Sequence, residues 1–453
     1  MKYPIGIQTF EKIIKEGYVY VDKTDMVYAL ATEGNTYFLS RPRRFGKSLL
    51  LSTLRAYFEG KKELFKGLKI DKLEKDWHVH RVFHFDFNSV NFTQPNALEE
   101  TLDYELSQWE KEYGIEAEFR NQFGLRLEKI LQVAAEQTGH GAVVLIDEYD
   151  KPLLDVLEVN PELLNNNREI LKGFYSTFKK ADAYLRFVFL TGVTKFSQVS
   201  VFSGFNQPKD ISMYEQFEAL CGITEEELHT QFAKPIREMA QTENCTEEEI
   251  KLRLKKHYDG YHFSKQMTDI YNPFSVLNAF DSKDIRDFWF ATGTPTYLIR
   301  LMNHFNEGID ELTGREYSLD EFVNYKADTE YPLPMIYQSG YLTIKNYDRE
   351  MDMFLLDFPN NEVKRGFLAM VASNYLQSGQ PMDSWIKRAV LSLRRGQIDQ
   401  FRQMLTAFLA SIPYSMRRKD EERERERYFQ YTFYLLLRLM SVYTVYIEKE
   451  QSE

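Results

Sequence analysis

Apolar runs alternate with amphipathic stretches along the first 200 residues of the chain. Residues 36–40 and 143–146 are short, continuous apolar runs, which are typical of central parallel strands covered on both faces. Residues 47–58 have apolar side chains at helical spacing. Further strands are expected at 18–21, 81–87 and 185–191, and further helices at 23–32, 99–113, 119–137 and 165–181. Because strands and helices alternate, the pattern predicts an α/β fold with a doubly wound parallel sheet.

After residue 222 the pattern becomes mainly helical. Thr224 and Thr246 are each followed three residues later by a glutamate, which is the signature of a capping box at a helix start. A short β-rich piece is expected at 340–344, and the alternating charges of residues 421–427 are typical of a solvated helix face. We therefore expect three parts, which comprise residues 1–222, 223–345 and 346–453.

Length, composition and charge narrow the class of protein. The 453 residues suit two or three domains, and a content of 43% hydrophobic and 28% charged residues indicates a folded globular protein. The net charge of −11 means that the molecule as a whole repels nucleic acid. No apolar stretch is long enough to cross a bilayer, and the first residues lack a secretory signal. Because Cys221 and Cys245 have neither metal-ligand nor disulfide spacing, we expect a protein of the reducing cytoplasm.

The segment from Arg41 to Ser48 has the setting of a phosphate-binding loop. It follows a predicted strand and begins a predicted helix, so backbone N–H groups and the helix N-terminus would converge on an anion. Lys47 can reach the β- and γ-phosphates, the Ser48 hydroxyl can bind Mg²⁺, and Gly46 lets the backbone approach the phosphates. The predicted nucleotide-binding residues are Arg41, Pro42, Arg43, Arg44, Phe45, Gly46, Lys47, Ser48 and Leu49.

One position departs from the usual pattern G-x-x-x-x-G-K-[ST], because Arg41 stands where that pattern has its first glycine. The tripeptide Gly-Lys-Ser is common by chance, so a basic turn that caps a helix is the alternative interpretation. The basic residues of the loop are better explained by the phosphates of a small ligand than by nucleic acid. Arg43 or Arg44 could clamp the γ-phosphate as an arginine finger supplied in cis, or could bind nearby acids.

A second apolar strand, downstream of the loop, ends in the two acids Asp147 and Glu148. Asp147 would hold Mg²⁺ through its water shell, and Glu148 would polarise the attacking water. The alternative is a strand followed by an acidic cap on residues 149–151. At the tip of the next strand, Thr191 or Thr194 could be a sensor residue that contacts the γ-phosphate or the attacking water, unless this tip is only a strand-to-loop turn. We predict ATP and Mg²⁺ as cofactors, with Glu148, Lys47, Thr191 and Arg44 as catalytic residues and Ser48 and Asp147 as metal ligands.

Six segments of the sequence are distinctive. They are YVDKT (20–24), SRPRRFGKS (40–48), LIDEYD (145–150), LTGVTKFS (190–197), YNPFSVLNAF (271–280) and TGTPTYL (292–298). Together they resemble the bacterial AAA-ATPase-like family, whose members carry a PD-(D/E)XK nuclease-like domain at the C-terminus. The resemblance covers essentially the whole chain, and Arg41 is this family's own version of the loop. It implies a core of the additional-strand, catalytic-glutamate class and a helical lid or winged-helix-like region, in which residues 293–295 are similar to a G-x-P element near the nucleotide.

The resemblance also implies that the C-terminal part is incomplete. Family members typically continue with a Gly-Arg-x-Asp segment and a strand bearing Glu-x-Lys, which would bind a metal and activate water for phosphodiester cleavage. This chain stops at Glu453, shortly after a β-rich run at 442–447 and before both motifs. We therefore expect only the beginning of a truncated nuclease-like domain and no DNA cleavage. Glu426 and Glu448 are either remnants of that site or surface acids.

The leading interpretation is a P-loop ATPase that acts as a conformational switch, in which hydrolysis changes the lid angle and an output part reads the change. The family resemblance links this switch to nucleic-acid processing or defence, with nucleic acid or another protein as a partner of the C-terminal region. Two alternatives stay open. One is a P-loop kinase that phosphorylates a small acceptor, and the other is a module that binds nucleotide without hydrolysing it.

Overall fold

The structure is a computed structural model that describes residues 1–116, 119–195, 205, 208–290, 312–324, 332–376, 382–411, 432–433 and 436–438. Several features expected from the sequence lie outside the described residues. They are the segment TGTPTYL with residues 293–295, the charged residues 421–427, the β-rich run at 442–447, and Glu426 and Glu448.

Five parallel strands form the central sheet. In chain order they are β1 (Thr36–Ser40), β2 (Val82–Asp86), β3 (Ala142–Asp147), β4 (Leu185–Gly192) and β5 (Lys209–Asp210). Their spatial order is β2-β3-β4-β1-β5, and all six residues of β3 are buried. The predicted doubly wound α/β fold is therefore confirmed. Because β4 lies between the strand that precedes the loop and the strand that ends in Asp147, the sheet contains the additional strand that the resemblance implied.

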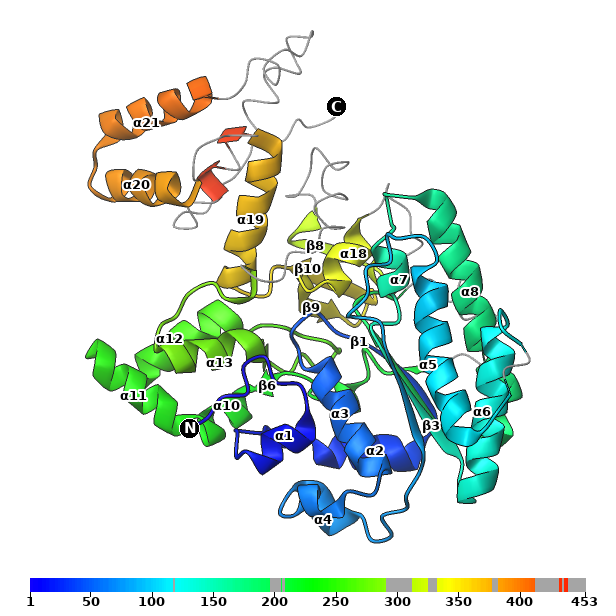
Figure 1. Cartoon of the computed structure of the whole chain (residues 1–453). Coiled ribbons are helices and arrows are strands. Elements are labelled where there is room, and N and C mark those ends of the chain that lie inside the picture. Colours follow the sequence, from blue (N-terminus) through cyan, green and yellow to red (C-terminus); the bar gives the residue numbers. More distant parts are fainter. Residues whose placement is uncertain are drawn as a thin grey trace.

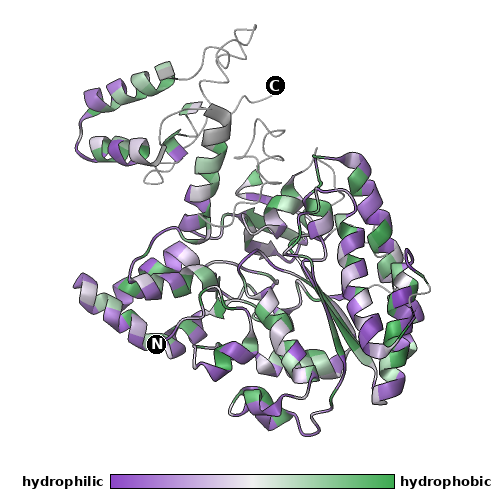
Figure 2. Ribbon diagram, in the orientation of Figure 1, coloured by the Kyte–Doolittle hydropathy of each residue, from purple (hydrophilic) through white to green (hydrophobic). Residues whose placement is uncertain are grey.

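Helices cover both faces of this sheet (Figure 1). One face carries α5 (Ala97–Tyr113), α6 (Phe123–Thr138) and α8 (Pro161–Lys180), and the other carries α1 (Phe10–Lys15), α2 (Thr24–Glu33) and α3 (Lys47–Phe58). Two short helices are α4 (Lys69–Leu73) and α7 (Lys151–Leu154). The strands lie at the hydrophobic end of the hydropathy scale, whereas the helices alternate polar and apolar residues (Figure 2). The five helices predicted for this part of the chain are confirmed, with ends that differ by a few residues.

The strand predicted at 18–21 is wrong. These residues form no regular strand, and the Val19 N–H donates a single hydrogen bond to the carbonyl of Lys2. Their apolar character has another cause. Tyr20 packs against Phe10, with ring centroids 5.1 Å apart, while Val19 and Val21 contact the hydrophobic cluster of the helical part that follows. The segment is apolar because it lies between two cores, not because it pairs in a sheet.

Residues 223–282 form a helical part with a hydrophobic cluster of its own. Its elements are β6 (Ile223–Thr224), α10 (Glu225–Gln231), α11 (Ala233–Glu243), α12 (Glu247–Tyr258), β7 (Ile270–Tyr271) and α13 (Pro273–Ser282). The two capping boxes predicted at Thr224 and Thr246 are confirmed, and they begin α10 and α12. β6 and β7 pair antiparallel, so the start of this part lies beside the segment that precedes α13.

A three-stranded antiparallel sheet follows, in the order β8-β10-β9. It consists of β8 (Arg315–Tyr317), β9 (Thr343–Asp348) and β10 (Met353–Asp357), accompanied by α17 (Leu319–Val323) and α18 (Leu333–Gln338). β9 begins within the β-rich piece expected at 340–344, and it continues across the domain boundary expected after residue 345. Because β9 and β10 form one hairpin, that boundary falls inside a structural unit.

Three helices end the described part of the chain, apart from short pieces between 432 and 438. They are α19 (Asn361–Leu376), α20 (Met382–Arg394) and α21 (Ile398–Ser411). Figure 1 shows α20 and α21 side by side at the far end of α19, away from the parallel sheet. Among the helices that the structure describes, none has the length and apolar character needed to span a membrane.

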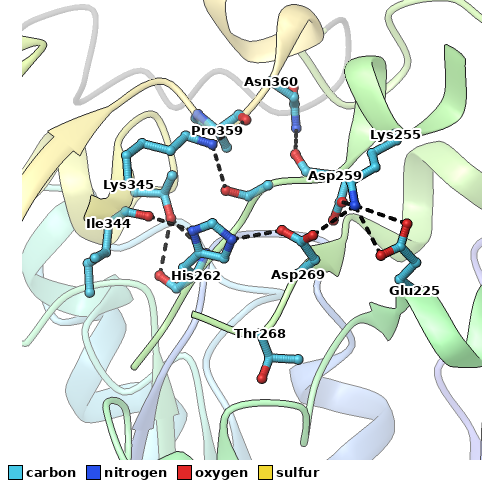
Figure 3. Close-up of polar contacts among 12 residues, drawn as sticks. Glu225, Lys255, Asp259, His262, Thr268, Asp269, Ile344, Lys345, Pro359 and Asn360 are labelled. Carbon is cyan, nitrogen blue, oxygen red and sulfur yellow. Dashed lines mark hydrogen bonds and ion pairs between the residues drawn. The ribbon is translucent and has the colours of Figure 1, made fainter. Parts of the chain in front are cut away.

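A polar network joins α12, β9 and the turn before α19 (Figure 3). The Lys345 ammonium donates to the carbonyls of Gly260 and Pro359, at 3.1 and 2.8 Å. Asp259 is only 2% exposed, and neither of its carboxylate oxygens has a hydrogen-bond partner among the described residues. The ammonium of Lys255 lies 3.9 Å away. Burial raises the pKa of Asp259 to about 7.

Candidate nucleotide-binding site

The loop between β1 and α3 has the backbone shape of a phosphate-binding loop. It follows Ser40, the last residue of β1, and α3 begins at Lys47. Gly46 has φ +95° and Arg44 has φ +66°, so the chain is left-handed at two positions before the helix. A side chain at Gly46 would be strained in this conformation even though nothing lies within 4 Å of the position of a Cβ atom. The first N–H groups of a helix have no partner within the helix, so the start of α3 is suited to bind a phosphate.

Lys47 is folded back over this loop. Its side chain is buried, and its ammonium donates to the carbonyls of Arg41 and Pro42, at 2.9 and 3.1 Å. Both acceptors belong to the loop itself. A phosphate placed in the loop would compete with these two carbonyls for the ammonium, and the phosphate contact of this lysine stays a prediction.

The two predicted metal ligands lie together, and the predicted sensor Thr191 joins them. The Ser48 hydroxyl donates to Asp147 Oδ2 at 2.5 Å, and the Thr191 hydroxyl donates to Asp147 Oδ1 at 2.6 Å. These side chains come from α3, β3 and β4, so the strand order brings them together. A hydroxyl and a carboxylate are hard oxygen ligands, which suit Mg²⁺, an ion that keeps several waters and few protein ligands.

Glu148 follows directly after β3, and its backbone is left-handed, with φ +51°. Such a conformation is uncommon for a glutamate and costs on the order of 1–3 kcal/mol, so the surrounding structure must enforce it. Its side chain lines the cavity beside Lys47. Burial raises the pKa of Glu148, although the positive charges of Lys47 and Arg43 act in the opposite direction. A carboxylate with a raised pKa next to the loop is suited to accept a proton from water.

Asp150 fixes the end of β3 to the end of β4. It is 1% exposed, and its Oδ2 accepts hydrogen bonds from the backbone N–H groups of Val193 and Thr194 and from the Thr194 hydroxyl. Thr194, the alternative sensor, is therefore occupied by Asp150, whereas the Thr191 hydroxyl points at Asp147. Asp150 therefore has a structural role, in addition to the roles predicted for Asp147 and Glu148.

The side chain of Arg41 does not line the cavity, which corrects the prediction that it binds nucleotide. It is 1% exposed, and its guanidinium donates to four backbone carbonyls, those of Ser40, Ser212, Phe217 and Glu218. It also lies over the Phe263 ring, 4.0 Å from the centroid. Arg41 therefore supports the loop from behind and can meet a nucleotide only through its backbone.

Two other loop residues also turn away from the cavity. Phe45 is buried against Tyr261, with ring centroids 4.8 Å apart, and Pro42 packs so closely on Gly340 that a Cβ atom there would lie 2.6 Å from the proline ring. Both predictions of nucleotide contact are therefore corrected for the side chains. Their apolar surfaces are needed where the loop meets the chain after α12 and α18.

Arg43 and Arg44 both line the cavity, but their surroundings differ. The guanidinium of Arg44 lies over the Phe274 ring, 4.9 Å from the centroid. The positive charge of Arg43 acts on Glu148 and partly opposes the rise that burial causes in the pKa of this carboxyl group. Of the two arginines, Arg43 is therefore the one that interacts electrostatically with the predicted general base Glu148. Arg44, the predicted catalytic arginine, contacts an aromatic ring instead.

The cavity in front of the loop has a volume of about 860 Å³ and is formed by five segments of the chain. The loop and the start of α3 contribute Arg43, Arg44, Gly46, Lys47, Ser48 and Leu49, and the segment after β3 contributes Glu148, Lys151, Leu154 and Asp155. The remaining walls are Pro4 to Gln8, residues between Asn88 and Thr93, and Pro273, Phe274 and Leu277 of α13. A volume of this size suits a nucleotide-sized ligand.

Comparison with known proteins places these features in a family. Residues 4–202 match the AAA-ATPase-like family, described as "Predicted AAA-ATPase". The "Uncharacterized protein in vnfD 5'region" of Azotobacter chroococcum mcd 1 is 36% identical over 444 residues, which cover 96% of this chain and 82% of the relative. The chain belongs to the AAA-ATPase-like family. A solved structure similar to it, that of the Aeropyrum pernix ORC1 protein in complex with DNA, has 12% sequence identity and a TM-score of 0.27, with 79% of this chain and 93% of that chain covered.

The AAA-ATPase-like protein has cavity residues that its sequence motifs did not reveal. The segment from Pro4 to Gln8 precedes α1, and Phe274 with Leu277 lies more than 200 residues beyond the loop. These residues are apolar or neutral, as expected for contacts with a base or sugar rather than with phosphates. No local spacing marks them. The only signal in the sequence is the segment YNPFSVLNAF, which contains Phe274 and Leu277 and contributes to the family resemblance.

Proposed function

We propose that this protein binds ATP with Mg²⁺ and hydrolyses it. The observation that carries the proposal is the pair of hydrogen bonds that bring Ser48 and Thr191 onto Asp147, beside the half-buried Glu148. A kinase or a passive nucleotide module would need Ser48, Asp147 and Lys47 equally. A carboxylate that can orient water and accept its proton at the phosphate end is the added feature that hydrolysis needs, and Glu148 lines the cavity there.

Each polar residue of the cavity then has a separate task. Ser48 and Asp147 would hold Mg²⁺, which when bound neutralises phosphate charge. Lys47 would exchange its two carbonyl partners for phosphate oxygens. The Glu148 carboxylate would orient a water molecule and accept its proton at Oε. Arg43 and Arg44, which both line the cavity, would bind phosphate oxygens.

Two substitutions test the proposal. Glu148→Gln should retain ATP affinity and lower turnover by roughly 100-fold or more, because removal of a general base typically costs 10²–10⁴. Lys47→Ala should weaken ATP binding itself. Binding is measured with a fluorescent ATP analogue and turnover by phosphate release, with Glu162→Gln on the first turn of α8 as the matched control.

Four outcomes test the proposal and separate the candidate functions. Unchanged phosphate release in Glu148→Gln contradicts the assignment of Glu148. Phosphate transfer that appears only when a small hydroxyl compound is added favours the kinase, and tight ATP binding without turnover in the parent protein favours a non-hydrolysing module. Full ATP affinity in Lys47→Ala would mean that the loop is not the nucleotide site.

The switch interpretation rests on where the cavity walls come from. Phosphate-binding residues belong to the α/β part, whereas Phe274 and Leu277 belong to α13 of the helical part. A nucleotide would touch both, so hydrolysis would change their relative position. We propose three parts, with the first boundary kept after residue 222 and the second moved from residue 345 to the end of the β9–β10 hairpin at Asp357. The nuclease-like C-terminal part, a nucleic-acid or protein partner, and a cytoplasmic location belong to the same proposal.

A further inference from the structure

Trp289 reaches the phosphate loop from far along the chain. Its side chain is 1% exposed, and its indole N–H donates to the carbonyl of Arg43 at 2.9 Å, across 246 residues of sequence. Arg43 belongs to the loop and lines the cavity. A buried indole N–H that lost this acceptor would carry an uncompensated desolvation penalty, so the tryptophan and the loop favour each other's positions.

Glu362, in the first turn of α19, is hydrogen-bonded to Trp289. Its Oε1 accepts the backbone N–H of Trp289 at 2.6 Å, and its Oε2 accepts the Ser275 hydroxyl at 2.8 Å. Glu362 is 1% exposed. Ser275 is in the first turn of α13, next to the cavity residue Phe274. One buried carboxyl group therefore orients both the residue that supports the loop and the helix that forms the opposite wall.

The packing around this carboxyl group leaves α19 little freedom to move independently. Gly366, one turn further along α19, lies against the ring of Phe290, and a Cβ atom at this glycine would be 2.2 Å from that ring. The Trp289 ring also packs on Tyr341, with centroids 5.2 Å apart. Any side chain at position 366 would separate the helix from residues 289 and 290. The contact between α19 and residues 289 and 290 is therefore close enough that a shift of one would move the other.

We propose that Trp289 and Glu362 are positioning residues for the phosphate loop, through which ATP binding is coupled to α19. Neither side chain lines the cavity, so neither touches the nucleotide. Trp289 fixes the Arg43 carbonyl, and Glu362 fixes Trp289 relative to α13. This inference rests on the proposed function, because it requires that the loop binds ATP.

Trp289→Phe tests the role of the indole N–H, since phenylalanine keeps a ring in the core but cannot donate. Trp385→Phe is the matched control. Trp385 is also buried, and its indole N–H donates to a carbonyl, that of Met404 at 3.3 Å, but it lies in α20. We expect Trp289→Phe to raise the dissociation constant of ATP roughly three- to ten-fold, the range for one net hydrogen bond, and Trp385→Phe to leave it unchanged. Affinity is measured by calorimetry on folded protein, so loss of stability alone would not produce this difference.

A second pair of variants separates positioning from packing. Glu362→Gln keeps an acceptor for the Trp289 N–H and should bind ATP within about two-fold of the parent, whereas Glu362→Leu should weaken binding as much as Trp289→Phe does. If the two residues act as one unit, combining Trp289→Phe with Glu362→Leu adds little further loss. Hydrogen exchange in α19 should slow on ATP binding in the parent and not in Trp289→Phe.

The inference is overturned if Trp289→Phe and Glu362→Leu bind ATP as the parent does while Lys47→Ala does not. If Lys47→Ala also retains full affinity, the proposed function fails first, because the loop is then not the nucleotide site.

Discussion

Replacing Arg41 by glycine would restore the residue that the common phosphate-loop pattern has at this position, yet we expect the protein to become less stable. The Arg41 guanidinium donates to four backbone carbonyls and stacks on Phe263, all within the protein interior. Glycine supplies none of these contacts. It would also leave space behind the loop, where a buried cation now connects β1 with the segment around Ser212 and Phe217.

The expected magnitude follows from these contacts. The bonds to Ser40 and Ser212, at 2.9 and 2.7 Å, are short, and hydrogen bonds to a charged group contribute about 1.5–3 kcal/mol each. The bonds to Phe217 and Glu218, at 3.3 and 3.4 Å, are weaker, and the aromatic contact adds about 1 kcal/mol. Against this, burial lowers the pKa of Arg41, which reflects the desolvation cost of the charge. We expect a net loss of about 3 kcal/mol in the free energy of unfolding.

Urea unfolding of the parent, Arg41→Gly and Arg41→Lys at neutral pH measures this loss. Lysine keeps the charge but not the planar fork, so this variant should fall between the other two. If Arg41→Gly unfolds with a free energy within about 0.5 kcal/mol of the parent, the guanidinium does not hold the loop and our account of the residue is wrong. ATP affinity measured on the same samples shows whether loop support and nucleotide binding are linked.

Two further predictions concern buried polar groups. Because burial raises the pKa of Asp259 from 3.8 to about 7, the folded state binds a proton more tightly than the unfolded state, and the stability contributed by this group falls as pH rises between these values. Asp259→Asn should therefore be more stable than the parent at pH 8, by up to about 4 kcal/mol, and much less so at pH 5; equal urea midpoints at pH 8 would refute this. Thr191→Val removes the hydroxyl from Asp147 Oδ1 and should raise the Mg²⁺ concentration needed for half-maximal phosphate release several-fold, whereas an unchanged Mg²⁺ titration would show that Thr191 does not orient Asp147.

The sequence predicted best those elements whose pattern is local and complete. The strand at 36–40 and the helix at 47–58 coincide with β1 and α3, because an apolar run, a glycine and a regular helical spacing follow one another without interruption. The proximity of Ser48, Asp147 and Thr191 was also predictable, since residues at the carboxyl ends of parallel strands share one edge of the sheet. Their mutual hydrogen bonds confirm this geometry.

What the sequence could not predict depends on contacts between distant segments. Residues 18–21 have the composition of a strand but lie between two cores, and composition alone cannot distinguish the two environments. Arg41 looked like a phosphate ligand because it is basic and stands in the loop; only the fold shows that four carbonyls surround its guanidinium. Trp289 gave no signal, because nothing near it in sequence indicates that its indole N–H faces Arg43.

The cavity also has a consequence for how the protein is made on the ribosome. Its first wall begins at Pro4 and its last wall ends at Leu277, so about 270 residues must be translated before all walls exist. About 230 of these residues follow the loop, and at about 5–20 residues per second their translation takes roughly 11 to 46 s. During this time the phosphate loop is already synthesised but has no α13 opposite it. Glu362, which holds Trp289, follows later still. A nascent chain that carries the complete loop motif therefore lacks the complete binding site. We expect it to bind nucleotide only after α13 has been synthesised.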